Sequence, residues 1–252
     1  MSDPHKAVQI AYAAMEFCNP LSHQTLDRVL RWAPLAPGMR TLDLGCGNGA
    51  MSIYLAETHG LTIDAIERSQ AVSAIARERL KGRGAPGSVT LHTVEGRAFL
   101  EDAEPYELVV AVGASGIVPG PPEPQAMLEA LKGYARPGGF VLWADPYWKA
   151  DPDPGFAAML APYGLYKSHV GNIEAGEAAG LELWYAGMSP DYEADDCMFS
   201  MYAAARRWLA DHPGAPEAAD VRGRAEMQRM AYQTFGRDTL GFGQYLFRRP
   251  PE

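Results

Sequence analysis

The chain has few cysteines, no long apolar run and no run of basic residues. Its three cysteines, Cys18, Cys46 and Cys197, lie far apart and lack the Cys-x-x-Cys spacing. This pattern predicts free thiols and argues against a disulfide framework or a bound metal. No segment reaches the apolar length that crosses a bilayer, and residues 1–6 lack the layout of a signal peptide. We therefore expect a cytoplasmic protein with no membrane partner.

The charge balance is acidic. The sequence holds 22 basic and 31 acidic residues, for a net charge of −9. No stripe of basic and aromatic residues is present that would neutralise a phosphate backbone, so we expect no nucleic-acid partner. A chain of 252 residues can bury a full core as one domain, residues 1–252.

The most informative segment is residues 41–49, which read Thr-Leu-Asp-Leu-Gly-Cys-Gly-Asn-Gly. A short apolar strand runs here into a glycine-rich turn and then into a helical pattern. Gly45, Gly47 and Gly49 can adopt positive φ and admit a ligand where a Cβ would clash. The helix that follows is predicted to pack one stripe on a sheet: Met51, Tyr54, Leu55 and Thr58.

The glycine spacing differs from that of a dinucleotide fingerprint, which reads G-x-G-x-x-G. Here the third glycine arrives one residue early, and Asp43 lies two residues before the first one. The segment resembles the first motif of the class I S-adenosylmethionine-dependent methyltransferases, which has the form D-L-G-C-G-x-G. Later segments follow in the order of that family over residues 39–148: strand 61–66 ending at Glu67, strand 88–94 before residues 96–98, strand 106–112, and residues 135–139 before strand 140–144.

The resemblance implies an α/β fold with a doubly wound, mostly parallel seven-stranded sheet and an antiparallel last strand, a Rossmann-like methyltransferase fold. Residues 1–38 are expected to form an N-terminal helical cap, residues 39–148 the cofactor-binding core, and residues 149–252 a lid, a helical insertion and the terminal strands. The periodicity predicts helices and further strands at these positions: helices 5–17, 22–32 with Ser22 as N-cap, 70–80, 125–135, 173–179, 196–211 and 217–235, and strands 181–186 and 242–248.

The resemblance also implies S-adenosylmethionine as cofactor and S-adenosylhomocysteine as product. The implied cofactor-binding residues are Asp43, Gly45, Cys46, Gly47, Asn48, Gly49, Glu67, Arg68, Arg97, Ala98, Val112 and Gly113. Glu67 is expected to accept the ribose hydroxyl protons, with Arg68 beside the adenine, because it ends a strand next to the glycine turn. Val112 and Gly113 are expected to present backbone to the methionine half of the cofactor. Cys46 and Asn48 are expected to contribute backbone contacts.

Two of these positions leave alternatives open. Asp43 either orients the turn amides or meets the cofactor amino group through water, or it is a turn-bracing acid. The family often has Asp where this chain has Arg97, and arginine only donates hydrogen bonds. Either Glu95 supplies the acceptor for the adenine amino group, or backbone and stacking at Ala98 and Phe99 recognise the ring.

The acceptor side is less defined. Residues 145–148, Asp-Pro-Tyr-Trp, resemble the Asp-Pro-Pro-Tyr signature of base-amino methyltransferases, but they follow the fifth strand and lack the second proline. We therefore prefer Tyr147 and Trp148 as walls of a substrate pocket or as core, with Tyr12 closing over the cofactor. The candidate catalytic groups are His169, as a general base for a hydroxyl acceptor, and Tyr147.

These features together predict methyl transfer to a small-molecule acceptor, at nitrogen, oxygen or sulfur, by in-line displacement. Positioning and desolvation dominate such a reaction because the sulfonium is already an activated donor. The protein is expected to be a monomer or a homodimer. The alternatives are a nicotinamide-dependent oxidoreductase, a non-catalytic S-adenosylmethionine-binding module, and a thiol or metalloid acceptor that uses Cys18 or Cys197.

Overall fold

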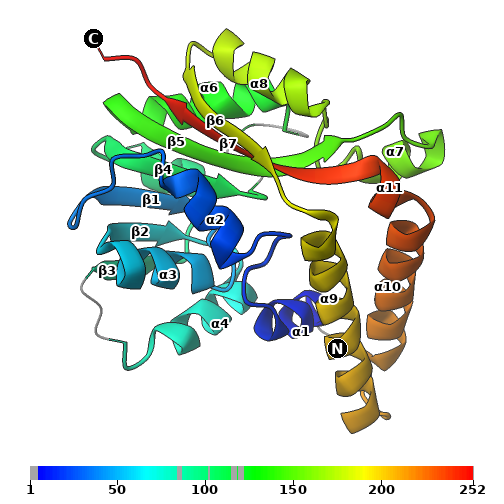
Figure 1. The fold of residues 1–252 in the computed structure, drawn as a ribbon. Coiled ribbons are helices and arrows are strands. Elements are labelled where there is room, and N and C mark those ends of the chain that lie inside the picture. The colour runs from blue at the N-terminus through cyan, green and yellow to red at the C-terminus, as the bar shows by residue number, and fades with distance from the viewer. Residues whose placement is uncertain (1–4, 84–86, 102, 115–117, 119–121, 252) are drawn as a thin grey trace.

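A computed structural model of the chain describes residues 5–83, 87–101, 103–114, 118 and 122–251, with the side chains of Arg97 and Leu100 left out. Within them lies a seven-stranded sheet of order β3-β2-β1-β4-β5-β7-β6 (Figure 1). The strands β1 to β5 pair in parallel, whereas β7 is antiparallel to both β5 and β6. The predicted fold class is confirmed. The strands are β1 (Arg40–Leu44), β2 (Thr62–Ile66), β3 (Ser88–His92), β4 (Tyr106–Val112), β5 (Ala135–Trp148), β6 (Glu182–Met188) and β7 (Leu240–Arg248).

Helices cover both faces of the sheet. The helices are α1 (Lys6–Ala14), α2 (His23–Leu30), α3 (Ala50–His59), α4 (Gln70–Leu80), α5 (Gly96–Leu100), α6 (Pro124–Tyr134), α7 (Pro154–Leu160), α8 (His169–Ala178), α9 (Asp191–Asp211), α10 (Ala218–Ala231), the π-helical turn η1 (Tyr232–Gly236) and α11 (Arg237–Thr239). In Figure 1, α2 and α3 lie on one face, α6 and α8 on the other, and α9 and α10 project away from the sheet beside α1. None of the described helices combines the length and the apolar composition needed to cross a membrane.

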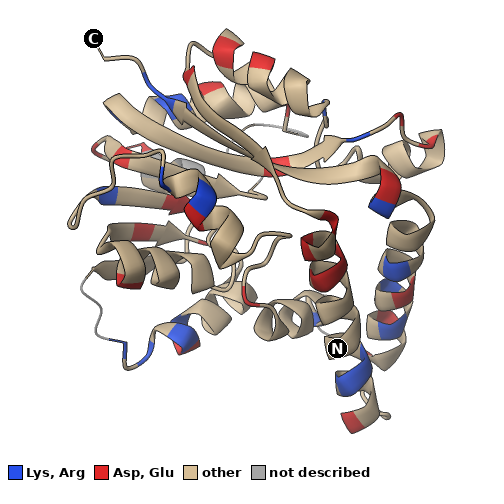
Figure 2. Cartoon of the chain, viewed as in Figure 1, with Lys and Arg blue, Asp and Glu red and all other residues tan. Residues whose placement is uncertain are grey.

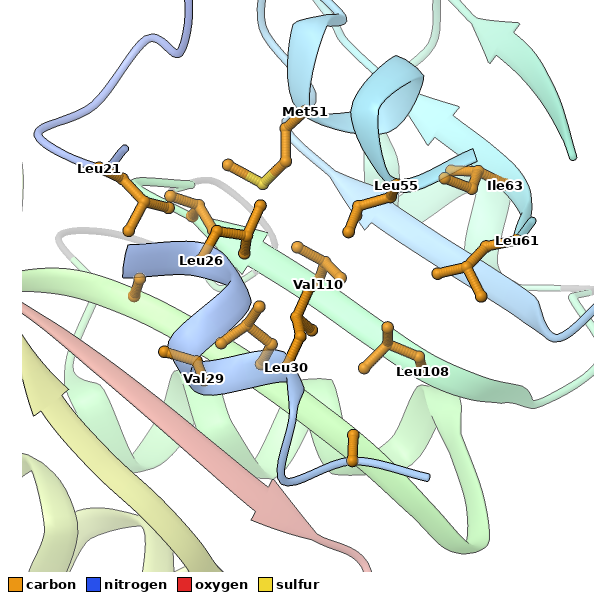
Figure 3. Close-up of a cluster of buried hydrophobic side chains, with 14 of the residues drawn as sticks. Leu21, Leu26, Val29, Leu30, Met51, Leu55, Leu61, Ile63, Leu108 and Val110 are labelled. Atoms are coloured by element: carbon orange, nitrogen blue, oxygen red, sulfur yellow. The ribbon is translucent and has the colours of Figure 1, made fainter. Parts of the chain in front are cut away.

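The central strand β4 is buried on both faces, which explains its unbroken apolar sequence. Leu108 and Val110 point to the α2 and α3 side, and Val109 and Ala111 to the α6 and α8 side. Figure 3 shows the first of these cores, in which the side chains of α2 and α3 meet those of the sheet. The labelled residues are Leu21, Leu26, Val29, Leu30, Met51, Leu55, Leu61, Ile63, Leu108 and Val110.

The N-terminal helices follow the predicted pattern with shorter bounds. Ser22 Oγ accepts the backbone N–H of Thr25 at 3.1 Å, so the predicted N-cap of α2 is confirmed. Helix α1 ends at Ala14 instead of residue 17. The carbonyl groups that follow it are bound by the side chains of Asn48 and Arg79, which satisfies them without further helix.

The predicted inner stripe of α3 is partly wrong. Met51 and Leu55 are buried, but Tyr54 is half-buried and Thr58 is exposed. The buried face is instead completed by Ser52, Ile53 and Ala56.

Strand β5 is longer than predicted and runs to Trp148 instead of residue 144. Its last residues, 145–148, pair with residues 240–243 of β7, so they lie in the sheet and do not follow it. Residues 151–155, Asp-Pro-Asp-Pro-Gly, were expected to lack regular structure at the root of the lid, but α7 begins within them at Pro154, and Asp153 Oδ1 caps its first turn. Helix α8 begins at His169, earlier than predicted, with Ser168 as its cap.

The insertion is joined to the core through Glu193, on the first turn of α9. Glu193 is 6% exposed, and its Oε1 accepts hydrogen bonds from Thr25 Oγ1 at 2.6 Å and from Ser22 Oγ. Figure 2 shows acidic residues gathered at this end of α9, where a helix N-terminus favours negative charge. The contact therefore fixes α9 against α2.

Replacing Glu193 with Ala is expected to lower the free energy of unfolding by about 2 kcal/mol, because the buried hydroxyl group of Thr25 and the half-buried one of Ser22 lose their acceptor. Urea denaturation measures the change. The matched control is Asp196→Ala, an exposed acid on the same helix, which should change stability little. Glu193→Gln keeps an acceptor oxygen and should fall between the two. Equal losses for Glu193→Ala and Asp196→Ala would contradict the assigned role.

Candidate functional site

A cavity of about 320 Å³ lies at the carboxyl ends of β1, β2 and β4. Parallel strands bring these ends to one edge of the sheet, where ligands of α/β proteins bind. Helix α1 closes the cavity from outside. Its walls comprise His5, Val8, Tyr12, Cys18, Asn19, Leu44, Gly45, Gly47, Ile66, Glu67, Arg68, Ser69, Val72, Glu95, Gly96, Val112, Gly113 and Ala114.

The glycine turn borders this cavity, and two of its glycines form part of the wall. Gly45 has φ +75° and Gly47 has φ +57°, conformations that L side chains rarely adopt. Space is also lacking: a Cβ on Gly45 would lie 2.9 Å from Ala114 Cβ, and one on Gly47 would lie 3.0 Å from Cys18 Sγ. The backbone of the turn therefore reaches the cavity without side chains.

Gly49 has a different place from the other two glycines. It has φ +77° and caps α3, and a Cβ there would lie 3.0 Å from Ala76 Cβ on α4. Gly49 is not part of the cavity wall. It brings two helices together behind the turn.

Glu67 lies where the sequence predicted, beside the glycine turn. Its Oε1 accepts the backbone N–H of Ser69 at 2.8 Å, and the carboxylate also accepts from the backbone N–H of Gly47. Burial raises the pKa of Glu67, and these backbone hydrogen bonds oppose the rise. The carboxylate is held in one orientation at the cavity wall.

Asp43 lies beneath the turn and outside the wall of the large cavity. It is 2% exposed, and its Oδ2 accepts from Ser52 Oγ on α3. Burial raises its pKa to about 6, with Glu67 adding to the rise and Ser52 opposing it. Asp43 borders a smaller cavity of about 20 Å³ together with Cys46 and Asn48. Its contact with Ser52 braces the strand against α3.

Asn48 contributes more than the predicted backbone contacts. Its Nδ2 donates to the carbonyl oxygens of Tyr12, Met15 and Glu16 at 2.9 to 3.0 Å, and its Oδ1 accepts from the Ala50 backbone N–H. The side chain therefore fastens the end of α1 over the turn. Sequence reasoning missed this role because the partners are distant backbone groups.

Asn19 is a second residue that sequence reasoning missed. Its Nδ2 donates to the carbonyl oxygen of Val112 at 3.1 Å, at the end of β4. A Cβ on Gly113 would lie 2.2 Å from Asn19 Oδ1, so the amide covers that glycine. The sequence showed only a helix break at this position.

The other predicted site residues divide into two groups. Tyr12, Arg68, Val112 and Gly113 line the cavity, and burial raises the pKa of Tyr12 to about 12. Ala98 is exposed on α5 and is not among the lining residues. Arg97 belongs to the same helix, but its side chain lies outside the described part of the structure.

Tyr147, Trp148 and His169 lie together, beyond the cavity wall at the far end of β5. The ring centroids of Tyr147 and His169 are 5.3 Å apart. His169 Nδ1 lies 3.0 Å from Tyr245 Oη, and burial lowers the pKa of His169. The hydroxyl of Tyr147 donates to Met188 Sδ.

The structure also bears on the predicted free thiols and on metal binding. All three cysteines are free. Cys18 lines the cavity, and burial raises its pKa to about 12, so it is a neutral thiol at neutral pH. Across the described ranges, no group of three or more His, Cys, Asp or Glu side chains is arranged to hold a metal ion.

Comparison with known proteins gives consistent matches. Residues 42–141 match the family model described as a methyltransferase domain. The chain is 28% identical to the YjhP protein of Escherichia coli, over 90% of this chain and 91% of that one. The structure of an S-adenosylmethionine-dependent methyltransferase of Geobacter sulfurreducens in complex with S-adenosylhomocysteine aligns with a TM-score of 0.85 and 25% identity, over 98% and 99% of the two chains.

A more distant likeness extends the fold comparison. The cyclopropane synthase MmaA2 of Mycobacterium tuberculosis aligns with a TM-score of 0.74 over 98% of this chain and 99% of that one, at 14% identity. At that identity the likeness concerns the fold. With the strand order, the antiparallel β7 and the glycine turn, the matches define the class. The chain is a class I S-adenosylmethionine-dependent methyltransferase.

Replacing Gly47 with Ala is expected to weaken S-adenosylhomocysteine binding at least tenfold, which corresponds to about 1.4 kcal/mol of binding free energy. Titration calorimetry measures this change. The matched control is Gly82→Ala, because Gly82 has φ +72° but nothing within 4 Å of its Cβ position. Both variants should lose about 1 kcal/mol of stability from the left-handed backbone. Only the Gly47 variant also crowds the cavity wall. Equal affinity in the two variants would show that the turn does not contact the cofactor.

Proposed function

We propose that the chain transfers the methyl group of S-adenosylmethionine, bound in the 320 Å³ cavity, to a small-molecule acceptor by in-line displacement. The observation that carries the proposal is the Glu67 carboxylate, which the Gly47 and Ser69 backbone groups hold at the cavity wall. A carboxylate fixed at this position can accept the two ribose hydroxyl protons. The glycine turn and Gly113 then leave room for the methionine half.

A hydrogen-bond acceptor lies at the end of the cavity where the adenine is proposed to bind. Glu95 lines the cavity, so its carboxylate can accept a hydrogen bond from the adenine amino group. The ring of Phe99 instead lies 4.4 Å from that of His92, centroid to centroid, and packs against the core. Of the alternatives left open by Arg97, this arrangement favours Glu95.

A small acceptor is supported by the closure of the site and by the charge of the surface. Tyr12 and Val8 of α1 cover the cavity, which leaves little room for a macromolecule. Figure 2 shows Lys and Arg on several separate elements of the described chain, with Asp and Glu among them. The methyl group needs only a lone pair in line with the sulfur–carbon bond, so the neutral groups Tyr12 and Cys18 suit the walls. The class of the chain removes the nicotinamide alternative.

Replacing Glu67 with Ala is expected to weaken S-adenosylhomocysteine binding at least tenfold, because two charge-assisted hydrogen bonds to the ribose are lost. Titration calorimetry at constant pH and salt measures this. Glu57→Ala, an exposed acid on α3, is the control and should bind as the wild type does. If Glu67→Ala kept full affinity, or if NADH bound in place of S-adenosylhomocysteine, the proposed function would be wrong.

A further inference from the structure

The strand order sets where an acceptor can approach. The carboxyl ends of neighbouring strands follow one another along the edge as β2, β1, β4 and β5. Glu67 lies at the first, Gly45 at the second and Gly113 at the third. A cofactor with its ribose at Glu67 and its methionine half at Gly113 therefore has β5 beyond it. The residue of β5 at that place is Asp145, because Gly113 N–H donates to the carbonyl oxygen of the preceding Ala144 at 2.8 Å.

Asp145 has the features of a group that awaits a partner. It lies deep among protein groups, and this burial alone raises its pKa to about 8. The residue is nevertheless partly exposed. Among the described residues, no hydrogen bond or ion pair to its carboxyl group is found, and no basic side chain contributes to the environment that sets its pKa. A buried carboxylate without a donor is costly unless a ligand supplies one.

Tyr166 and Tyr245 lie near enough to this carboxyl group to interact with it electrostatically. In the β5–β7 ladder Asp145 pairs with Gly243, and Tyr147 pairs with Gly241. Both glycines leave room for rings: a Cβ on Gly241 would lie 2.4 Å from the Tyr147 ring, and one on Gly243 would lie 2.3 Å from Tyr245 Oη. The Tyr245 hydroxyl therefore lies over the residue directly across from Asp145.

Tyr166 adds a further ring. It interacts electrostatically with Asp145, and its ring centroid lies 5.7 Å from that of Trp148. Aromatic faces and a carboxylate together favour an organic cation, and an ammonium group in particular.

We propose that Asp145, with the rings of Tyr147, Tyr166 and Tyr245, forms the acceptor subsite, and that the acceptor is an amine whose ammonium group is held and deprotonated by the Asp145 carboxylate. The proposal rests on the proposed function, since it takes the cofactor to lie along the same edge. It deepens that function by naming nitrogen as the methylated atom and Asp145 as the catalytic base.

The reaction balances with these groups. The Asp145 carboxylate takes one proton from the ammonium, which leaves a neutral amine with a free lone pair. The lone pair forms the nitrogen–carbon bond as the sulfur–carbon bond breaks, and that bonding pair stays on sulfur. The sulfonium charge is thereby transferred to the methylated ammonium product. Asp145 keeps the proton until it is released.

Tyr245, which interacts electrostatically with Asp145, is part of a hydrogen-bonded group. Asn172 Nδ2 donates to Tyr245 Oη at 3.1 Å, and His169 Nδ1 lies 3.0 Å from the same oxygen. Because burial lowers the pKa of His169, its ring is neutral at neutral pH and can accept the Tyr245 proton. Tyr245 Oη then has one lone pair left, which can accept from a protonated Asp145. His169 and Tyr245 would then position the protonated Asp145.

The test uses tetramethylammonium chloride as probe, added to the complex of the full chain with S-adenosylhomocysteine and followed by calorimetry. The probe has no titratable proton, so its binding follows the charge of the site. We expect its affinity to rise at least tenfold between pH 6.5 and pH 9, as Asp145 ionises through a pKa of about 8. The groups that face Asp145 do not ionise in that window: burial raises the pKa of Tyr147, Tyr166 and Tyr245 and lowers that of His169.

Two variants complete the experiment. Asp145→Asn should bind S-adenosylhomocysteine as the wild type does, but lose at least tenfold in probe affinity at pH 9 and lose the pH dependence. Asp151→Asn, an exposed acid beyond the end of β5, is the matched control and should change neither. Binding of S-adenosylhomocysteine by the wild type without probe binding at any pH, or probe binding unchanged in Asp145→Asn, would overturn the inference alone. Absence of S-adenosylhomocysteine binding would overturn the proposed function.

Discussion

The site depends on how closely the backbone of the glycine turn after β1 approaches the neighbouring elements. Three glycines with left-handed φ alternate with Cys46 and Asn48, and each faces a different part of the chain: Gly45 the end of β4, Gly47 the loop after α1, and Gly49 helix α4. A side chain at any of them would separate elements that now touch. Because the turn holds three surfaces at contact distance, the cavity has its shape before a ligand enters it.

The same turn also anchors the cover of the cavity. Asn48 binds the carbonyl groups at the end of α1, and Asn19 binds the end of β4, so the N-terminal segment is held at both sides of the cavity. Glu193 then joins α2 to α9 through the hydroxyl groups of Ser22 and Thr25. These side-chain hydrogen bonds thus add to the apolar packing of α2 on the sheet in joining the cap and the insertion to the core.

Local signals predicted much of the fold, and distant contacts account for what they missed. The bounds of α4 and β4 agree with the predicted residues 70–80 and 106–112, because a capping serine and a buried apolar run define them within a few residues. The end of β5 could not be predicted, since its last residues are strand only through pairing with β7. Asn19 and Asn48 were hidden for the same reason. Their partners are backbone groups that any residue type supplies.

The extension of β5 and β7 beyond the rest of the sheet places residues 145–148 in paired strands at the same edge as the cavity. Shorter strands would end near Ala144, level with β4, and residues 145–148 would be a loop. Strand pairing instead fixes the direction of Asp145 and Tyr147, and the paired glycines of β7 provide the space that their side chains and Tyr245 fill. A carboxyl group on a loop would find water or a basic partner. Held in a sheet among aromatic rings, Asp145 remains without a partner and close to the place where β4 ends, so a cationic ligand is the species that best compensates for its burial.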